Sequence, residues 1–327
     1  MARSTPDLRL VAAALSIAAT GAPAMARELA AVDTGLRAPV STSRRIAVVA
    51  AHGGAGATTA VARAGIELSR RRWGAVLVVD AARGSASLAA RVGVTAPLSL
   101  ARDRERGSGV THTAQARALF PRGTAGLAVL GAGAVLSAGA VLGAGAVPSA
   151  DAARQASPAQ WRAAVDPVGR FFDVILTDWG ARADGGQLGQ IASAHHGVVV
   201  VSRADRGCAE RAAALVARLA AVPVGPRIAL LLVDVGGTGG PTAGLLRREL
   251  ASSHLHAAVL AVPHEHRLAA AGSAELGHRL GHATRLAYAR LAVELLTLRR
   301  DRPGTDARGT APRAAASRST NPRRADA

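Results

Sequence analysis

A glycine-rich segment, HGGAGATT at residues 52–59, directly follows the apolar run IAVVA. Its glycines let the backbone turn tightly with its N–H groups pointing inward, as binding of an anion requires. A helix expected to begin near Thr58 adds unsatisfied N–H groups and the positive end of its dipole. The Thr58 hydroxyl occupies the position that ligates Mg²⁺ in loops of this kind. The segment therefore predicts a phosphate-binding loop that turns at Gly53, Gly54 and Gly56.

Two aspartates stand at the ends of later apolar runs. Asp80 ends AVLVVD, and Asp178 follows DVILT. If both runs are strands, each of these aspartates lies at the carboxyl end of its strand. Two alternatives stay open: a strand-to-helix turn without a ligand, and a dinucleotide-binding turn with Asp80 as its acidic residue. The dinucleotide pattern fits less well, because Thr59 stands at the position of its third glycine.

The elements that must position these residues alternate along the chain. From Arg44 onward, short β-branched runs are followed by amphipathic or alanine-rich helices, which is typical of a parallel sheet covered on both faces. Ser157 before Pro158, and Asp205, mark two helix starts, and a last helix is expected from about Ala283. The expected strands are IAVVA from Ile46, AVLVV from Ala75, LAVL from Leu127, DVILT from Asp173, GVVVV from Gly197, IALLLV from Ile228 and AAVLAV from Ala257.

Three motifs in chain order carry a resemblance to a known family. They are the spacing x-G-G-x-G-x-T-T after the first strand, VLVVDAARGSASLAARVGV after the second, and FFDVILTDWG further on. Over about residues 25–298 the chain resembles the MinD/ParA family of P-loop ATPases. Its closing segment, from VLAVPHEH to LAVEL, is similar to actinobacterial members, some of which are associated with type VII secretion.

This resemblance implies a three-layer α/β P-loop NTPase fold with a mainly parallel sheet. It also implies bound ATP and Mg²⁺, and a dimer, either a homodimer or a heterodimer with a related ATPase. By position, the residues at the nucleotide would be His52, Gly53, Gly54, Ala55, Gly56, Ala57, Thr58, Thr59, Asp80, Asp178 and Asp234, with Thr58 and Asp178 at the metal.

The chain departs from the family pattern, K-G-G-x-G-K-[ST]-T, at its charged positions. His52 replaces the signature lysine, which in the family reaches the partner's nucleotide, and Ala57 replaces the lysine that grips the β- and γ-phosphates. Ala82 replaces the acidic or amide residue that helps to orient the attacking water. Asp234 stands near the usual adenine-binding asparagine, and a carboxylate there cannot donate to a ring nitrogen. The result is a degenerate Walker A loop.

These departures affect hydrolysis more than binding. A cation on the transferring phosphoryl group is worth about 10³–10⁵ in rate, or about 4–7 kcal/mol. Backbone N–H groups supply part of the phosphate contacts, so we expect weak or lost binding of ATP and Mg²⁺, with negligible turnover. The first hypothesis is a regulatory or scaffolding pseudo-ATPase of a cell-division, partitioning or type VII secretion system. The second is a slow but genuine ATPase in which His52 and a partner's arginine replace the lysines.

Composition adds a third hypothesis, a basic nucleic-acid-associated protein. The net charge of the 327 residues is +18 and comes from arginine, because the chain has no lysine. An arginine-rich tail at residues 299–327, which we expect to be disordered, could contact DNA or an acidic partner. Aromatic residues make up only 2%, which argues against a base-stacking platform. Cys208 is the single cysteine, so an internal disulfide is excluded.

The expected domain is 44–298, preceded by an extension at 1–43 and interrupted by a flexible insertion at about 131–157. The insertion contains a six-residue unit written three times, GAVLSA GAVLGA GAVPSA. An apolar run with an A-x-A-like site within residues 1–25 also fits a secretory signal. Its acidic residue, its alanine content and the fold that follows favour a cytoplasmic protein. No apolar run is long enough for a membrane-spanning helix.

Overall fold

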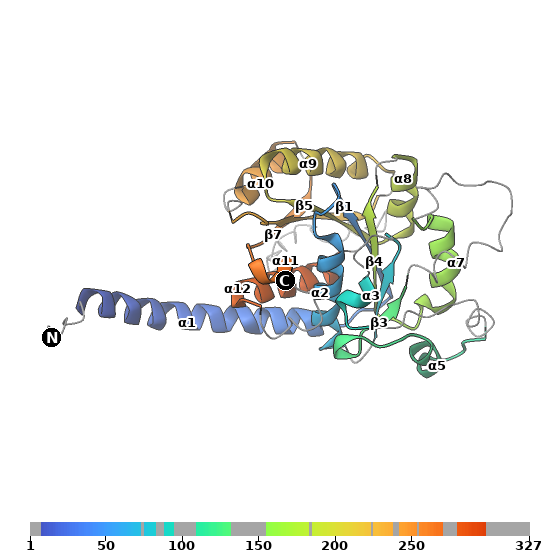
Figure 1. Cartoon of the computed structure of the whole chain (residues 1–327), viewed down its shortest axis with the longest axis horizontal. Coiled ribbons are helices and arrows are strands. Elements are labelled where there is room, and N and C mark those ends of the chain that lie inside the picture. The colour runs from blue at the N-terminus through green and yellow to red at the C-terminus, as the bar shows by residue number, and fades with distance from the viewer. Residues whose placement is uncertain are drawn as a thin grey trace, which may run out of the picture.

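Seven strands form one sheet in the order β3-β2-β4-β1-β5-β6-β7, and every strand pair is parallel (Figure 1). All seven apolar runs predicted from the sequence form strands, so the α/β fold with a parallel sheet is confirmed. The strands are β1 (Arg44–Ala50), β2 (Val76–Asp80), β3 (Ala128–Leu130), β4 (Val174–Ala181), β5 (Gly197–Arg203), β6 (Arg227–Val233) and β7 (Ala257–Val262). This computed structural model describes residues 8–72, 75–82, 88–94, 109–131, 155–182, 185–223, 225–237, 242–253, 255–270 and 280–298.

Helices cover both faces of the sheet, which gives the protein three layers. Side chains of α7 (Pro158–Gly169), α8 (Gly185–Ala194), α9 (Arg206–Ala220) and α10 (Thr242–Ser252) share one core cluster with the sheet. Side chains of α1 (Leu8–Arg37), α2 (Ala57–Ser69), α3 (Leu88–Arg91) and α12 (His282–Thr297) share the other. The shorter elements are α5 (Thr113–Ala118), the 3-10 helix η1 (Thr124–Gly126) and α11 (His266–Ala270).

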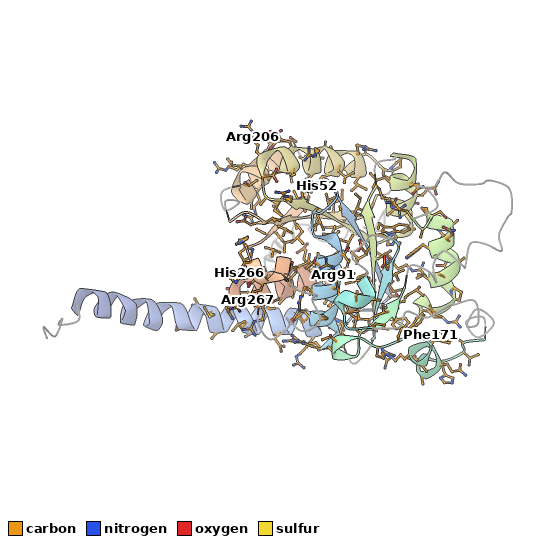
Figure 2. The ribbon with its side chains drawn as sticks, viewed as in Figure 1. His52, Arg91, Phe171, Arg206, His266 and Arg267 are labelled. Atoms are coloured by element: carbon orange, nitrogen blue, oxygen red, sulfur yellow. The ribbon has the colours of Figure 1, made fainter. Side chains whose placement is uncertain are left out.

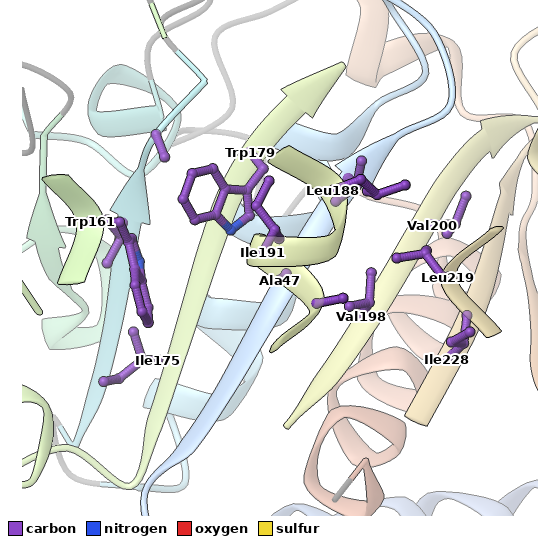
Figure 3. Packing of buried hydrophobic residues seen from close by; sticks show 14 of the residues in the cluster. Ala47, Trp161, Ile175, Trp179, Leu188, Ile191, Val198, Val200, Leu219 and Ile228 are labelled. Carbon is purple, nitrogen blue, oxygen red and sulfur yellow. The ribbon is translucent and has the colours of Figure 1, made fainter. Parts of the chain in front are cut away.

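The strands are apolar throughout because both of their faces are buried. In β1, Ala47 and Val49 belong to the cluster under α7–α10, whereas Ile46 and Val48 belong to the cluster under α2 and α12. This alternation follows from the two-residue period of a strand. Figure 3 shows the first cluster, in which Trp161 and Trp179 lie beside the aliphatic side chains of neighbouring elements.

Two predicted helix starts are confirmed in atomic detail. The Ser157 hydroxyl accepts the N–H of Gln160, whose side chain accepts the N–H of Ser157, and this completes a capping box. The Asp205 carboxylate accepts the N–H of Cys208 at 3.0 Å. The last helix, α12, begins at His282, one residue before the predicted position.

A long N-terminal helix was not predicted. The helix α1 runs from Leu8 to Arg37, through Pro23, and projects from the body of the protein in Figure 1. Its C-terminal end packs against α12: Leu36 is fully buried, and a Cβ atom at Gly35 would lie 2.8 Å from Val293 Cγ1. None of the helices among the described residues combines the length and the apolar character needed to cross a membrane.

Two of the predicted segments are not covered by the structure. The tail at 299–327 lies outside the described residues, and so does the predicted insertion except for its ends, 131 and 155–157.

Candidate functional site

The glycine-rich loop joins β1, at the centre of the sheet, to α2. Gly54 and Gly56 adopt left-handed conformations with φ of 73° and 95°, which side chains with a Cβ rarely adopt. The helix α2 begins at Ala57, and no side chain caps its N-terminus. Ala57 is 5% exposed, so its methyl group is buried in the turn. The first turn of α2 thus presents N–H groups toward the loop, as predicted, without a charged side chain at position 57.

His52 is turned toward its own backbone and toward β5. Its Nδ1 lies 3.0 Å from the Gly53 carbonyl oxygen, and the N–H of Arg203 approaches its Nε2 at 3.4 Å. One neutral tautomer satisfies both contacts, with Nδ1–H donating and Nε2 accepting. Both ring nitrogens of His52 are therefore used in backbone contacts.

Asp178 is fully buried at the carboxyl edge of the sheet. Its Oδ1 accepts the N–H of Gly180 at 2.9 Å, and its Oδ2 is buried with no hydrogen-bond partner among the described residues. Burial raises the pKa of Asp178 to about 6; contact with the Thr58 side chain lowers this pKa, and the charge of Asp80 raises it. A buried carboxylate oxygen without a donor is costly unless a cation or water meets it.

The strand that carries Asp178 is longer than predicted. β4 continues to Ala181 because its pairing with β1 shifts by one residue, so that Val48 faces Asp178 and Val49 faces Gly180. Trp179 is the residue skipped in this bulge, and its indole is fully buried near Trp161 and His195. The aromatic packing accounts for the extra length of the strand.

Asp80 lies beside Asp178, as predicted, but its carboxylate is engaged with the backbone. The two residues are register partners on β2 and β4. The Asp80 oxygens accept the N–H groups of Ala82 at 3.2 Å and Leu88 at 3.3 Å. Asp80 therefore holds the start of α3 as well as adding negative charge next to Asp178.

Asp234 follows β6 and closes its own turn. Its Oδ1 accepts the N–H of Gly237 at 2.7 Å, and its own N–H donates to Val262. The preceding residue, Val233, lines the loop, because a Cβ atom at Gly56 would lie 3.6 Å from it. The structure thus brings Thr58, Asp80 and Asp178 together, whereas His52 and Asp234 are used in local backbone contacts.

Arg182 belongs to this edge and was not found from the sequence. Its guanidinium is buried and donates to four oxygens: those of Trp179 at 2.9 Å, Gln187 at 2.8 Å, Ala81 at 3.0 Å and Ala156 at 3.0 Å. Burial lowers the pKa of Arg182 to about 10, while Asp178 acts in the opposite direction. Arg182 ties the ends of β2 and β4 to the start of α7 and to α8. Four of its five N–H donors are therefore used in these contacts.

The donor set suits a hard divalent cation. The Asp178 carboxylate and Thr58 hydroxyl supply oxygen ligands, and Mg²⁺ is usually held by one or two such groups together with water and phosphate. Among the described residues, no group of three or more His, Cys, Asp or Glu side chains is arranged to hold a metal on its own. The site is therefore compatible with Mg²⁺ that arrives with a phosphate ligand.

Known structures share this architecture. A ParA family ATPase from Chlorobium tepidum TLS superposes with a TM-score of 0.55 at 14% identity, over 77% of this chain and 99% of that chain. A chain of the MinC:MinD cell division protein complex of Aquifex aeolicus gives 0.54 at 18%, over 77% and 96%. MinD of Pyrococcus horikoshii OT3, complexed with Mg-ADP, gives 0.51 at 19%, over 77% and 96%. The chain has a MinD/ParA-like fold.

Sequence comparison adds a relative of a different kind. The ESX-1 secretion-associated protein EspI of Mycobacterium tuberculosis, in two strains, is 32% identical over 170 residues, which are 52% of this chain and 23% of EspI. The chain thus matches less than a quarter of the length of these curated relatives. No family model matches the chain. The assignment of a MinD/ParA-like fold therefore rests on the structural comparison.

Proposed function

We propose that this protein is a MinD/ParA-like nucleotide-binding module that binds a nucleotide with Mg²⁺ weakly, hydrolyses it at no more than a background rate, and acts as a regulatory or scaffolding member of a secretion system. Three features support the proposal: a glycine-rich loop followed by a helix without a side-chain cap, an incompletely paired carboxylate beside it, and alanine at position 57.

The buried Oδ2 of Asp178 is the observation that carries the binding part. It lies at the start of α2, where the Thr58 side chain contacts Asp178 and where the helix has no side-chain cap. A ligand that brings both an anion and a divalent cation would pair with both the helix N-terminus and the carboxylate. The phosphate would accept from the N–H groups of α2, and the cation would bind Asp178.

The absence of hydrolysis is inferred from the side chains around the loop. Ala57 offers only a buried methyl group, and both ring nitrogens of His52 contact the backbone. Arg182 lies next to Asp178, but it donates to four protein oxygens. Ala82 has no group to orient water. Phosphoryl transfer depends on cations that stabilise its transition state, so without them turnover falls to background.

The likeness to EspI favours a secretion system over cell division or partitioning for this protein. The same proposal includes a cytoplasmic location. It also includes a dimer, formed with a second copy or with a related ATPase. The DNA-binding alternative depends on the tail, which lies outside the described residues, and nothing in the described part favours it.

Titration calorimetry with ATP and ADP, with and without MgCl₂, tests the binding part, and phosphate release tests the hydrolysis part. We expect Mg²⁺-dependent binding, and phosphate release no faster than from buffer. Thr58→Val is the matched control, because it keeps the branched shape and removes the hydroxyl, so it should remove the Mg²⁺ dependence. Steady turnover that Thr58→Val abolishes would contradict the proposal, and so would the absence of heat with either nucleotide.

A further inference from the structure

An arginine on α3 contacts the first turn of the loop helix. Arg91, the last residue of α3, donates from Nη1 to Thr59 Oγ1 at 3.1 Å. Figure 2 shows Arg91 beside α2, away from His52, which lies near the end of β1. Thr59 is the third residue of α2, so this contact brings the guanidinium to the first turn of the helix, where an anion is expected.

A second cation reinforces the positive potential on this side of α2. Arg63, one turn after Thr59, is 4% exposed; burial lowers its pKa, Tyr288 raises it, and the charges of Arg70 and Arg91 lower it. Burial raises the pKa of Tyr288, on α12, to about 12, and Arg63 and Arg91 both act against this rise. Glu67, a further turn along, pairs with Arg70 and Arg71.

The metal side and the arginine side of α2 are separate. Successive residues of an α-helix are about 100° apart around its axis, so Thr58 and Thr59 face different directions. Thr58 contacts Asp178, whereas Thr59 contacts Arg91. A guanidinium at Thr59 can therefore contact a phosphate group bound at the loop without standing between Asp178 and a metal ion.

The position of Arg91 is linked to the acidic edge. Asp80 accepts the N–H of Leu88, the first residue of α3, and Arg91 is the last residue of the same four-residue helix. α3 therefore spans from a carboxylate at the metal side to the hydroxyl of Thr59. This short, rigid connection fixes Arg91 beside the loop.

We propose that Arg91 is a phosphate-binding residue that supplies, from α3, the cationic contact that position 57 lacks. The proposal rests on the proposed function for the nucleotide, but its chemistry is that of any di- or polyphosphate. It assigns Arg91 to binding and not to hydrolysis, because the guanidinium lies on the side of α2 that turns away from Asp178.

The test uses the full chain with pyrophosphate and ADP as probes, each with MgCl₂, in titration calorimetry. Arg91→Ala should weaken binding of both probes by about tenfold or more, as expected for a charge-assisted hydrogen bond, and should make the affinity less sensitive to salt. Arg71→Ala is the matched control, because it also removes one charge from this side of the protein but pairs with Asp33 and Glu67. This variant should change the affinity less than twofold, because exposed ion pairs contribute little free energy.

Arg91→Gln separates charge from structure. Glutamine keeps a hydrogen-bond donor for Thr59 but carries no charge, so it should bind as weakly as Arg91→Ala, whereas Arg91→Lys should retain part of the affinity. Wild-type affinity in a folded Arg91→Gln variant would overturn the proposal. Binding of pyrophosphate but not of ADP by the wild type would refute the nucleotide function and leave Arg91 in place. Binding of neither probe would overturn both.

Discussion

The N-termini of α2 and α7 differ in how their backbone N–H groups are capped. At α7, Ser157 and Gln160 satisfy each other's backbone N–H groups through their side chains. At α2, the residue before the helix is Gly56, in a left-handed conformation, and no side chain caps the N–H groups. The unpaired N–H groups at a helix N-terminus need hydrogen-bond acceptors. In α7 the capping side chains supply them, whereas in α2 the N–H groups are left for a ligand.

The two sides of the α2 start also differ. On the acidic side, Thr58, Asp80 and Asp178 are in contact or in register, and the carboxylates are also bound to the backbone. On the other side, His52 and Ala57 occupy the two positions that are lysines in the related pattern. The acidic residues also build the edge of the sheet, so they have a structural role that a loop lysine does not have. Replacing these aspartates would therefore disturb backbone contacts at the edge of the sheet, as well as any ligand they hold.

Replacing Asp178 by asparagine should have the largest effect, because it removes a buried charge. The folded-state pKa, about 6, is above the usual aspartate value of 3.8, so the folded protein binds the proton more tightly than the unfolded chain. The stability this confers is fully present below pH 3.8 and is lost as the pH rises through 6. We expect Asp178→Asn to be more stable than the wild type by about 2–3 kcal/mol at pH 7.5 and by far less near pH 4.

Urea unfolding at the two pH values measures this difference, and Asp166→Asn is the control. Asp166 is half exposed and pairs with Arg45, so its replacement should change the stability by less than about 1 kcal/mol at either pH. The same Asp178→Asn variant should lose the Mg²⁺ dependence of nucleotide binding. Equal stability of Asp178→Asn and the wild type at pH 7.5 would show that the carboxylate is already compensated, and the acidic side would then need no cation.

Restoring a cation at the α2 start should have the next largest effect, on affinity. Ala57→Lys should tighten binding of ATP by about tenfold or more, because a charged donor then meets the phosphates. Turnover should stay near background, because His52 and Ala82 are unchanged. Ala57→Met, which has a similar length and no charge, is the control in the same titration. An equal gain with methionine would mean that packing, and not charge, limits the affinity.

The sequence predicts the scaffold better than the side-chain contacts, for a physical reason. Apolar runs and helix caps act locally, so all seven strands and the starts at Ser157 and Asp205 were correctly predicted. The contacts of Arg182 and Arg91 depend on backbone and hydroxyl oxygens that are brought near only by folding. In an arginine-rich chain nothing in the sequence marks these two among 40 basic residues.

A change at the capped N-terminus of α7 should affect stability and leave nucleotide affinity unchanged. Ser157→Ala removes the capping hydroxyl of α7 and should lower the free energy of unfolding by about 1 kcal/mol. Nucleotide affinity should be unchanged, because α7 satisfies its own N–H groups. Parallel urea unfolding and calorimetry on this variant measure both quantities. A loss of affinity in Ser157→Ala would show that the two helix starts are coupled, for example through Arg182, which donates to the carbonyl of the neighbouring Ala156.

The smallest effect is expected at His52. Both ring nitrogens are used in contacts with the loop and with β5. His52→Ala should therefore weaken nucleotide binding by less than about threefold, the worth of a neutral hydrogen bond of modest strength. Calorimetry at pH 7.5 measures the change. A tenfold loss would mean that the ring leaves these contacts and binds the phosphate, and position 52 would then belong to the binding site.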